Sequence, residues 1–222
     1  MKRIGVIAAL PGELKPLVKG WQQRGQLYIG QIGEAECIAT AGGVGAGAAT
    51  HACELILAEG KIDALVSYGW AGAISCGLKP PGAYVIAEVV DSRSNEHFQT
   101  ASEGGQRLVT LDHIALYDEK RSIAEKFRAP LVDMEAAAVA RIAAARDVAF
   151  YCFKGISDGY TDKLPDFNPF MGKDGQLQMP AFIAYALFHP KYWGALKRLG
   201  QQSRAAADNL ASLANVAIGK TL

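Results

Sequence analysis

The sequence is poor in cysteine, and the few cysteines it has are scattered. The 222 residues contain four, Cys37, Cys53, Cys76 and Cys152, and no two of them form a Cys-x-x-Cys pair. Disulfide frameworks and structural zinc sites need closely spaced or numerous cysteines, so neither is indicated. The pattern predicts reduced, mostly buried thiols in a cytoplasmic protein.

Excess charge of one sign and long apolar runs are also missing. The chain has 23 basic and 22 acidic residues, a formal net charge of +1, and no basic run, so it lacks the electrostatic footprint of a nucleic-acid-binding surface. No apolar run reaches transmembrane length, and the one near the N-terminus is too short for a signal peptide. The four histidines show no metal-ligand spacing. We therefore expect no nucleic acid and no metal as partners.

What the chain does have is a regular alternation of apolar segments and helical segments. Half of its residues are hydrophobic, enough for one substantial core, and we expect a single domain over residues 1–222. Strands are predicted at 3–10, 27–31, 36–41, 62–68, 83–90, 108–111, 131–134 and 148–156. Helices are predicted at 48–59, 118–128, 135–146, 179–188 and 192–217. This alternation is typical of an α/β fold.

Two acidic residues stand at the ends of predicted buried strands. Glu135 follows the strand 131–134 and begins the alanine-rich helix 135–146, and Asp158 comes directly after the apolar run 148–156. In open α/β sheets, ligands gather beyond the carboxyl ends of strands, where both side chains would project. Each acid alone is explained equally well by a local role, at a helix start or as an N-cap. Together they favour a site.

The residues around these acids resemble those of a known family. Val132-Asp133-Met134-Glu135-Ala136, followed by Ile156-Ser157-Asp158, is similar to the paired signature of the purine nucleoside phosphorylase and methylthioadenosine/S-adenosylhomocysteine nucleosidase superfamily. The opening strand followed by Glu13 and the glycine segments 43–45 and 69–72 resemble the same family, so the likeness spans essentially the whole chain. It implies a three-layer α/β/α fold with a central mixed, partly closed sheet. The last third looks most like the hopanoid-associated nucleoside phosphorylase group.

The resemblance implies that three acids share the cleavage of the bond between ribose and purine. Asp158 would protonate the departing base at N7, with its pKa raised by apolar surroundings. Glu135 would bind the ribose hydroxyls and oppose the positive charge on the sugar, and Glu13 would activate water on the other face. Without the resemblance, Glu13 is better explained as an exposed glutamate at a helix start.

Further residues are predicted to contact the substrate. His113 and Ile114 follow the strand 108–111, where the family has its base pocket, although a lone histidine after a strand is more often a plain polar residue. Trp70 departs from the family pattern, and it either lines the pocket or packs in the core. The predicted substrate-binding residues are Met134, Asp133, Ser157, His113, Ile114, Trp70, Gly69 and Phe167.

The nucleophile stays open at this point. The glycine-rich segment 41–47 brings backbone N–H groups toward a ligand, so Gly43 and Gly45 are candidate phosphate-binding residues, although close strand–helix packing calls for glycine equally. The phosphorylases have an arginine and a serine that contact phosphate where this chain has Ser67 and Trp70. Glu13 favours hydrolysis, whereas the likeness to a phosphorylase group favours phosphate. We expect water or inorganic phosphate as co-substrate and no cofactor.

The segment 161–172 is too long and too rich in aromatic residues and proline for a plain connection. It predicts a lid in which Phe167, Phe170 and Met171 cover an apolar substituent of the substrate. Anchoring of the loop to the core explains the same residues equally well.

Two functions are compatible with the sequence. The first is an enzyme that cleaves the N-glycosidic bond of an adenosyl-type purine nucleoside, with an adenosylated hopanoid precursor as one substrate. The alternative is a non-catalytic nucleoside-binding or regulatory protein, suggested by Trp70 and the short region 91–105. The resemblance also implies a homo-oligomer, a dimer or larger. Lys191 and Tyr192 begin a helix that either contacts a membrane, if the substrate is a lipid, or packs on its own domain.

Overall fold

The computed structural model describes residues 1–170, 172 and 178–221. Within these residues, ten strands form one sheet: β1 (Arg3–Ala8), β2 (Gln22–Arg24), β3 (Leu27–Ile32), β4 (Ala35–Ala41), β5 (Ala64–Ala73), β6 (Ala83–Asp91), β7 (His97–Gln99), β8 (Gln106–Thr110), β9 (Leu131–Asp133) and β10 (Ala149–Asp158). The helices are α1 (Pro11–Leu14), α2 (Ala46–Leu57), α3 (Tyr117–Phe127), α4 (Ala136–Ala145), α5 (Met179–Leu187) and α6 (Trp193–Thr221), with short 3-10 helices η1 (Asn168–Phe170) and η2 (Pro190–Tyr192).

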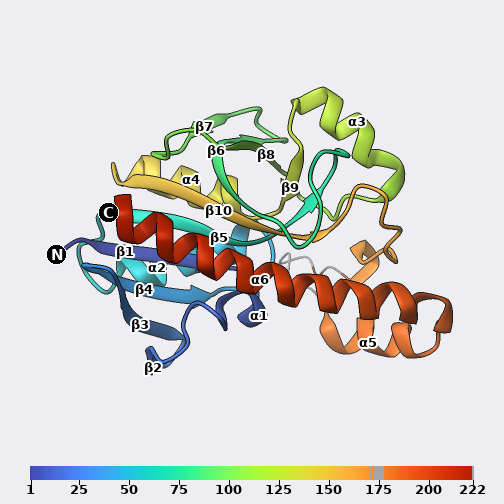
Figure 1. Ribbon diagram of the computed structural model, residues 1–222, viewed down its shortest axis with the longest axis horizontal. Helices are drawn as coiled ribbons and strands as arrows, with labels where there is room; N and C mark the ends of the chain where they lie inside the picture. The colour runs from blue at the N-terminus through green and yellow to red at the C-terminus, as the bar shows by residue number, and fades with distance from the viewer. Residues whose placement is uncertain (171, 173–177, 222) are drawn as a thin grey trace.

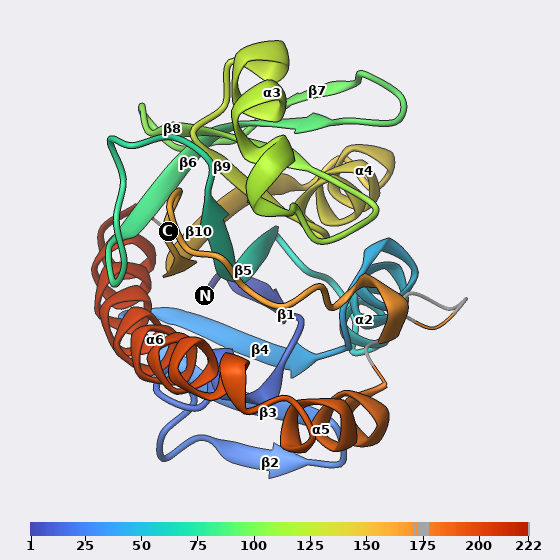
Figure 2. The ribbon, with the colours of Figure 1, turned by 90° about the vertical axis from the view of Figure 1, so that its right-hand side faces the viewer.

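Part of the sheet closes on itself. β10, β6, β8, β9 and β5 are hydrogen-bonded in that order, and β5 pairs again with β10. The remaining strands extend the sheet from β5 through β1 and β4 to β3 and β2, which lie at the lower edge of Figure 2. Parallel pairs such as β1–β5 and β5–β10 are mixed with antiparallel ones such as β5–β9. The predicted mixed, partly closed sheet is confirmed.

Helices cover both faces of this sheet. The long α6 lies across one face, on β10, β5 and β6, while α2 and α4 pack together on the other (Figure 1). Alternate residues of β10 divide between the two cores: Cys152 packs on the α2–α4 side, and Phe153 packs against Leu210 of α6. This is the period-two alternation of a strand that is buried on both faces. The predicted three layers are confirmed.

The strand β5 is longer than the sequence predicts. We expected a strand over 62–68 followed by a glycine turn, but β5 continues through Trp70 and Gly72 to Ala73. The reason is pairing on both sides, since Trp70 lies opposite Gly155 of β10, and Gly72 lies opposite Val132 of β9. Tertiary pairing overrides the turn preference of glycine.

The two shortest strands, β2 and β7, were not predicted. Each has three residues, too few to give a periodic signal, and β7 lies in the short region 91–105.

The cysteines are unpaired, and three are buried, as predicted. Burial raises the pKa of the Cys37 and Cys152 thiols to about 12. In the part of the chain that the structure describes, no helix is long and apolar enough to cross a bilayer.

Candidate active site

A cavity of about 270 Å³ lies beyond the ends of β1, β5, β9 and β10. Its charged lining residues are Glu13, Lys120, Asp133, Glu135 and Asp158, and its other lining residues include Trp70, Met134, Ser157, His113, Ile114 and Phe167. Three acids from distant parts of the chain therefore converge on one space, as the sequence predicts. The two lysines discussed below were not among the predicted site residues.

Glu13 is held at one end of the cavity by backbone groups. Pro11 starts the short α1 directly after β1, which turns Glu13 inward, and it is only 3% exposed. Its Oε2 accepts N–H bonds from Ala9 and Leu10, and its Oε1 accepts one from Trp70, all at 2.8 Å. Burial nevertheless raises its pKa, which suits a base that must take a proton from water. The exposed helix-start explanation of Glu13 is therefore wrong.

Gly69 creates the room for this carboxylate. Its φ is +154°, and a Cβ at this position would lie 2.8 Å from Glu13 Oε1. A larger residue would displace the Glu13 carboxylate, so glycine is needed here to leave space. Gly69 was predicted to bind substrate, and that role stays a prediction.

Glu135 is the residue that precedes α4, and its side chain lines the cavity. Its Oε1 accepts the Gly45 N–H at 2.7 Å, and its Oε2 lies 3.3 Å from the Met134 nitrogen. Burial, followed by repulsion from Asp133, raises its pKa to about 8. The Gly45 N–H therefore has the Glu135 carboxylate as its acceptor, whereas a phosphate site would need this N–H to face a bound phosphate.

A buried ion pair lies beneath Glu135. Lys154 points from β10 toward Asp133, with 2.8 Å between Lys154 Nζ and Asp133 Oδ2, and the two side chains are 2% and 0% exposed. Thr110 and the Ala136 N–H also donate to Asp133. Burial opposes the charge on Lys154, but the Asp133 carboxylate outweighs it and the pKa of Lys154 is raised. Asp133 thus fixes the start of α4 and also lines the cavity, and its contact with substrate stays a prediction.

Asp158 lies at the other end of the cavity, and its oxygens are not in apolar surroundings as we expected. Lys120 Nζ is 2.7 Å from Oδ2, and Ser157 Oγ donates to Oδ1 at 2.9 Å. Lys120 comes from α3, which corresponds to the helix predicted at 118–128, and its side chain is only 2% exposed. A second bond at 2.8 Å joins its Nζ to the Gly159 carbonyl. This end of the cavity therefore contains an ammonium group.

His113 and Ile114, predicted for the base pocket, lie at the Asp158 end of the cavity, where they meet the segment that contains Asn168. The Asn168 side chain accepts the Ile114 N–H at 2.8 Å and donates to the Ile114 carbonyl at 3.1 Å. His113 contacts Asp112 and Glu119 through its two ring nitrogens, and despite the opposing effect of burial these carboxylates raise its pKa. His113 and Ile114 line the cavity, so they stay candidate base contacts.

Two roles were left open for the aromatic residues of the segment 161–172: facing the substrate and anchoring the loop. Phe167 lines the cavity and is 8% exposed, and its ring packs on Phe182 of α5 with centroids 4.6 Å apart. Phe170 packs against Phe182 and Tyr185. Phe167 thus faces the cavity, and Phe170 anchors the loop. Met171, also predicted here, lies outside the described residues.

Trp70 lies beside Glu13 in the cavity wall. A Cβ added to Gly12 would be 3.2 Å from its ring, and its backbone N–H is the donor to Glu13 already described. The indole Nε1 is buried without a hydrogen-bond partner among the described residues. Trp70 therefore lines the pocket and narrows it next to the Glu13 carboxylate.

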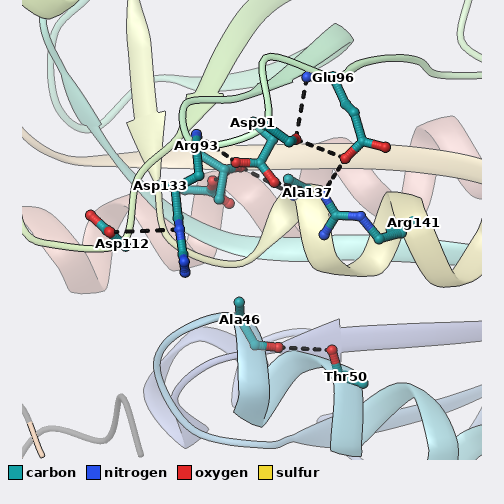
Figure 3. A network of polar contacts seen from close by, with 11 residues as sticks. Ala46, Thr50, Asp91, Arg93, Glu96, Asp112, Asp133, Ala137 and Arg141 are labelled. Atoms are coloured by element: carbon teal, nitrogen blue, oxygen red, sulfur yellow. Dashed lines mark hydrogen bonds and ion pairs between the residues drawn. The ribbon is translucent and has the colours of Figure 1, made fainter. Parts of the chain in front are cut away.

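A second hollow adjoins the first at Met134 and is bounded by Gly45–Gly47 of the glycine segment. The arginines here are Arg141, which bonds Asp91 at 2.6 Å and Glu96 at 2.5 Å, and Arg93, which lies 3.9 Å from Asp112 (Figure 3). Both cations are thus paired with acids of the protein. They do not form an open cradle for phosphate.

The family follows from the sequence over most of the chain. A family model described as the phosphorylase superfamily matches residues 3–113 and 110–179. The chain belongs to the phosphorylase superfamily. The predicted family is confirmed, and with it an enzyme of the nucleoside phosphorylase and nucleosidase class. The hopanoid-associated group stays a prediction.

Solved structures share the fold of this phosphorylase-superfamily chain at low sequence identity. The 5′-methylthioadenosine/S-adenosylhomocysteine nucleosidase of Neisseria meningitidis superposes with a TM-score of 0.73 at 17% identity over 99% of both chains. The corresponding nucleosidase of Helicobacter pylori gives 0.72 at 16% identity over 98% of both chains. The futalosine hydrolase of that organism gives 0.71 at 15% identity, over 98% of this chain and 97% of the other. Comparison with curated protein sequences gives no match.

Three residues of this superfamily chain were missed by the sequence interpretation. Lys154 carried a signal, because a lysine inside an apolar strand must find a partner when it is buried. Lys120 shares a face of its helix with Ile123, Ala124 and Phe127, but nothing in the sequence linked this face to the cavity. Asn168 is an ordinary loop residue until its partner Ile114 is known. Among the described residues, no group of three or more His, Cys, Asp and Glu side chains is arranged to hold a metal ion.

Proposed function

We propose that this phosphorylase-superfamily protein is a nucleosidase that hydrolyses the N-glycosidic bond of an adenosyl-type purine nucleoside. The observation that supports it best is Glu13, a buried carboxylate with a raised pKa that lines the cavity opposite the Asp158 end. Cleavage of this bond makes the sugar positive and the base negative, so an enzyme must stabilise both. The cavity offers acids for the sugar and a cation for the base.

Glu135 and Glu13 are assigned different roles by their position. We assign the ribose to Met134 and Glu135, whose carboxylate would accept the sugar hydroxyls and oppose positive charge on the ring. Glu13 would take a proton from the attacking water. The base would lie between Phe167 and Asp158, with His113 and Ile114 beside it.

Hydrolysis is favoured over phosphorolysis by the way the cations are engaged. Phosphate binding calls for arginine or lysine side chains, or for free backbone N–H groups. Lys120 and Lys154 are paired with Asp158 and Asp133, none of the described arginines lines the cavity, and the Gly45 N–H is donated to Glu135. Gly43 lies in the same segment and has no role of its own in this mechanism.

The ligands of similar structures support a proposal for the substrate class. The neighbours from Helicobacter pylori and Neisseria meningitidis were solved with butyl-thio-DADMe-Immucillin-A and methylthio-immucillin-A. We propose an adenine nucleoside with an apolar 5′ substituent, for which an adenosylated hopanoid precursor is one candidate. The one-domain organisation, the homo-oligomer and the cytoplasmic location stay predictions.

Product analysis tests the reaction. Purified protein is incubated with 5′-methylthioadenosine with and without inorganic phosphate, and the products are separated by chromatography. We expect adenine and free methylthioribose in both cases. A sugar 1-phosphate formed only with phosphate would show phosphorolysis, and nucleoside binding without turnover would favour the regulatory alternative.

We also propose that a lipid-linked substrate is reached at a membrane surface, through the end of the molecule formed by α5 and the start of α6. Large apolar side chains are exposed here, namely Ile183 (50%), Leu187 (63%), Phe188 (82%) and Trp193 (53%). The segment 178–207 contains four basic residues and no acidic one. Exposed apolar and basic residues together match an anionic lipid surface.

The double variant Leu187→Asp with Phe188→Asp is expected to bind anionic phosphatidylserine vesicles at least about tenfold more weakly, because two apolar side chains no longer insert. Cosedimentation measures this, and Val216→Asp, at an apolar position of similar exposure (54%) farther along α6, is the control. Hydrolysis of a water-soluble nucleoside should be unchanged. Equal binding of wild type and double variant would contradict the proposed contact.

A further inference from the structure

The Trp70 side chain forms the cavity wall beside the Glu13 carboxylate. Trp70 lies on β5, its backbone N–H donates to Glu13 Oε1 at 2.8 Å, and both residues line the cavity. Its six-membered ring reaches over Gly12, the residue before Glu13, where an added Cβ would lie 3.2 Å from Cη2 and 3.8 Å from Cζ2. The opposite residue of β10 is Gly155, which has no side chain to share this space. A nucleophile that reaches Glu13 must therefore fit beside the indole.

The hydrogen bonds of Glu13 show which of its oxygens is open to a nucleophile. A carboxylate has about four acceptor positions, shared between its two oxygens. Oε2 accepts the N–H groups of Ala9 and Leu10, whereas Oε1 accepts only that of Trp70. Among the described residues, the free acceptor position is thus on Oε1, the oxygen bound by Trp70. Water that gives its proton to Glu13 has to approach this oxygen.

We propose, on the basis of the hydrolytic function proposed above, that the Trp70 indole restricts the nucleophile to water by limiting the space next to Glu13 Oε1. In the reaction, the water oxygen bonds to C1′ and one of its protons goes to Glu13. The bond from C1′ to the base nitrogen breaks, and its electron pair moves to the base, which takes up a proton at the end of the cavity where Asp158, Lys120 and His113 lie. Solvent then removes the proton from Glu13 and replaces the one given to the base. A nucleophile with one more heavy atom would meet the indole.

Methanol tests the size of this space without a change of charge. Exclusion of phosphate has a second explanation, because Lys120 and Lys154 are already paired with acids. Methanol is neutral and needs no cation, and it differs from water by one methyl group. A pocket discriminates against a group of this size by about 10–200-fold. The share of methyl riboside among the products formed in a water–methanol mixture therefore reports the space next to Oε1.

A smaller side chain at position 70 enlarges this space and leaves the other contacts of Glu13 in place. The indole Nε1 is buried without a hydrogen-bond partner among the described residues, so its removal breaks no such bond. The backbone N–H that binds Glu13 is present in every variant. With 5′-methylthioadenosine as substrate, we expect Trp70→Ala to raise the share of methyl riboside by about tenfold or more, and Trp70→Phe to give an intermediate share. Chromatography of the sugar products measures both.

Trp21→Ala is the matched control. Trp21 is partly buried, packs against the core and does not line the cavity, so its loss loosens the protein without changing the site. The share of methyl riboside from this variant should equal that from the wild type.

The share of methyl riboside separates the outcomes. An equal share from wild type and Trp70→Ala would overturn the proposal. A slower reaction or a higher KM with an unchanged share would show that Trp70 contacts the substrate or supports the wall, which also overturns it. If Trp70→Ala does not fold, the share from Trp70→Phe decides in the same way. Failure of the wild-type protein to release free methylthioribose in water would instead contradict the hydrolytic function on which the proposal rests.

Discussion

Glu13→Gln is expected to slow release of the base by about 10²–10⁴-fold, the usual loss when a general base is removed. The Glu13 carboxylate is the group that would take a proton from water, and an amide cannot do so. Because burial raises the pKa of Glu13, the wild-type rate should increase with pH above the ordinary range for a carboxylic acid. In Glu13→Gln this dependence should disappear. Steady-state rates from pH 5 to pH 9 measure both effects.

A moderate loss of stability should accompany the loss of activity. The glutamine carbonyl can accept the N–H groups of Ala9 and Leu10, but its amide then faces the Trp70 N–H as a second donor. One unsatisfied donor costs about 1–3 kcal/mol, and removal of the buried charge offsets part of this cost as pH rises. Glu103→Gln, at an exposed position, is the control. A variant that keeps wild-type activity at neutral pH would remove Glu13 from the mechanism.

Glu135→Gln is expected to reduce turnover by about 10²–10³-fold, because the positive charge that develops on the sugar loses its facing carboxylate. The same substitution should stabilise the protein at alkaline pH. The pKa of Glu135 is about 8 in the folded protein and 4.5 in the reference state. Between these values the folded state holds a proton that the unfolded chain has lost, so stability falls as pH rises through this window.

Glutamine does not titrate, so the advantage of the variant should grow between pH 5 and pH 8.5. We expect a difference on the order of a few kcal/mol at the upper end, with about 2–4 °C in Tm for each kcal/mol. Thermal unfolding at a series of pH values measures it, with the exposed Glu54→Gln as the control. A difference in Tm that does not change with pH would contradict the raised pKa.

The sequence was sufficient to predict that the acids converge, but not to predict that Lys120 and Lys154 form ion pairs in and beneath the cavity. Glu135 and Asp158 follow strands, and the carboxyl ends of strands in an α/β sheet are where ligands gather, so their convergence was predictable. Glu13 needed the family resemblance, because its local sequence is that of an ordinary helix start. Lys120 reaches the cavity because the apolar face of α3 packs with residues of β6, β8 and β9, which brings its side chain to Asp158 at the end of β10. That tertiary placement is not encoded in the local sequence.

The role of each glycine was equally difficult to predict. Gly45 and Gly69 were predicted to meet a ligand directly, and this stays a prediction. In the structure the Gly45 N–H donates to the carboxylate of Glu135, and Gly69 leaves space for that of Glu13. A glycine pattern indicates close approach of the backbone to another group, and whether that group is a ligand or a side chain depends on the tertiary structure.

Among the described residues, the two lysines pair with Asp133 and Asp158, whereas neither Glu13 nor Glu135 forms an ion pair. Burial raises the pKa of both glutamates, and repulsion from Asp133 adds to the effect at Glu135, so each tends to hold a proton. A positively charged group arriving between them would favour the ionised forms. Binding of a cation, or formation of one during the reaction, thus expels protons from the protein into solvent.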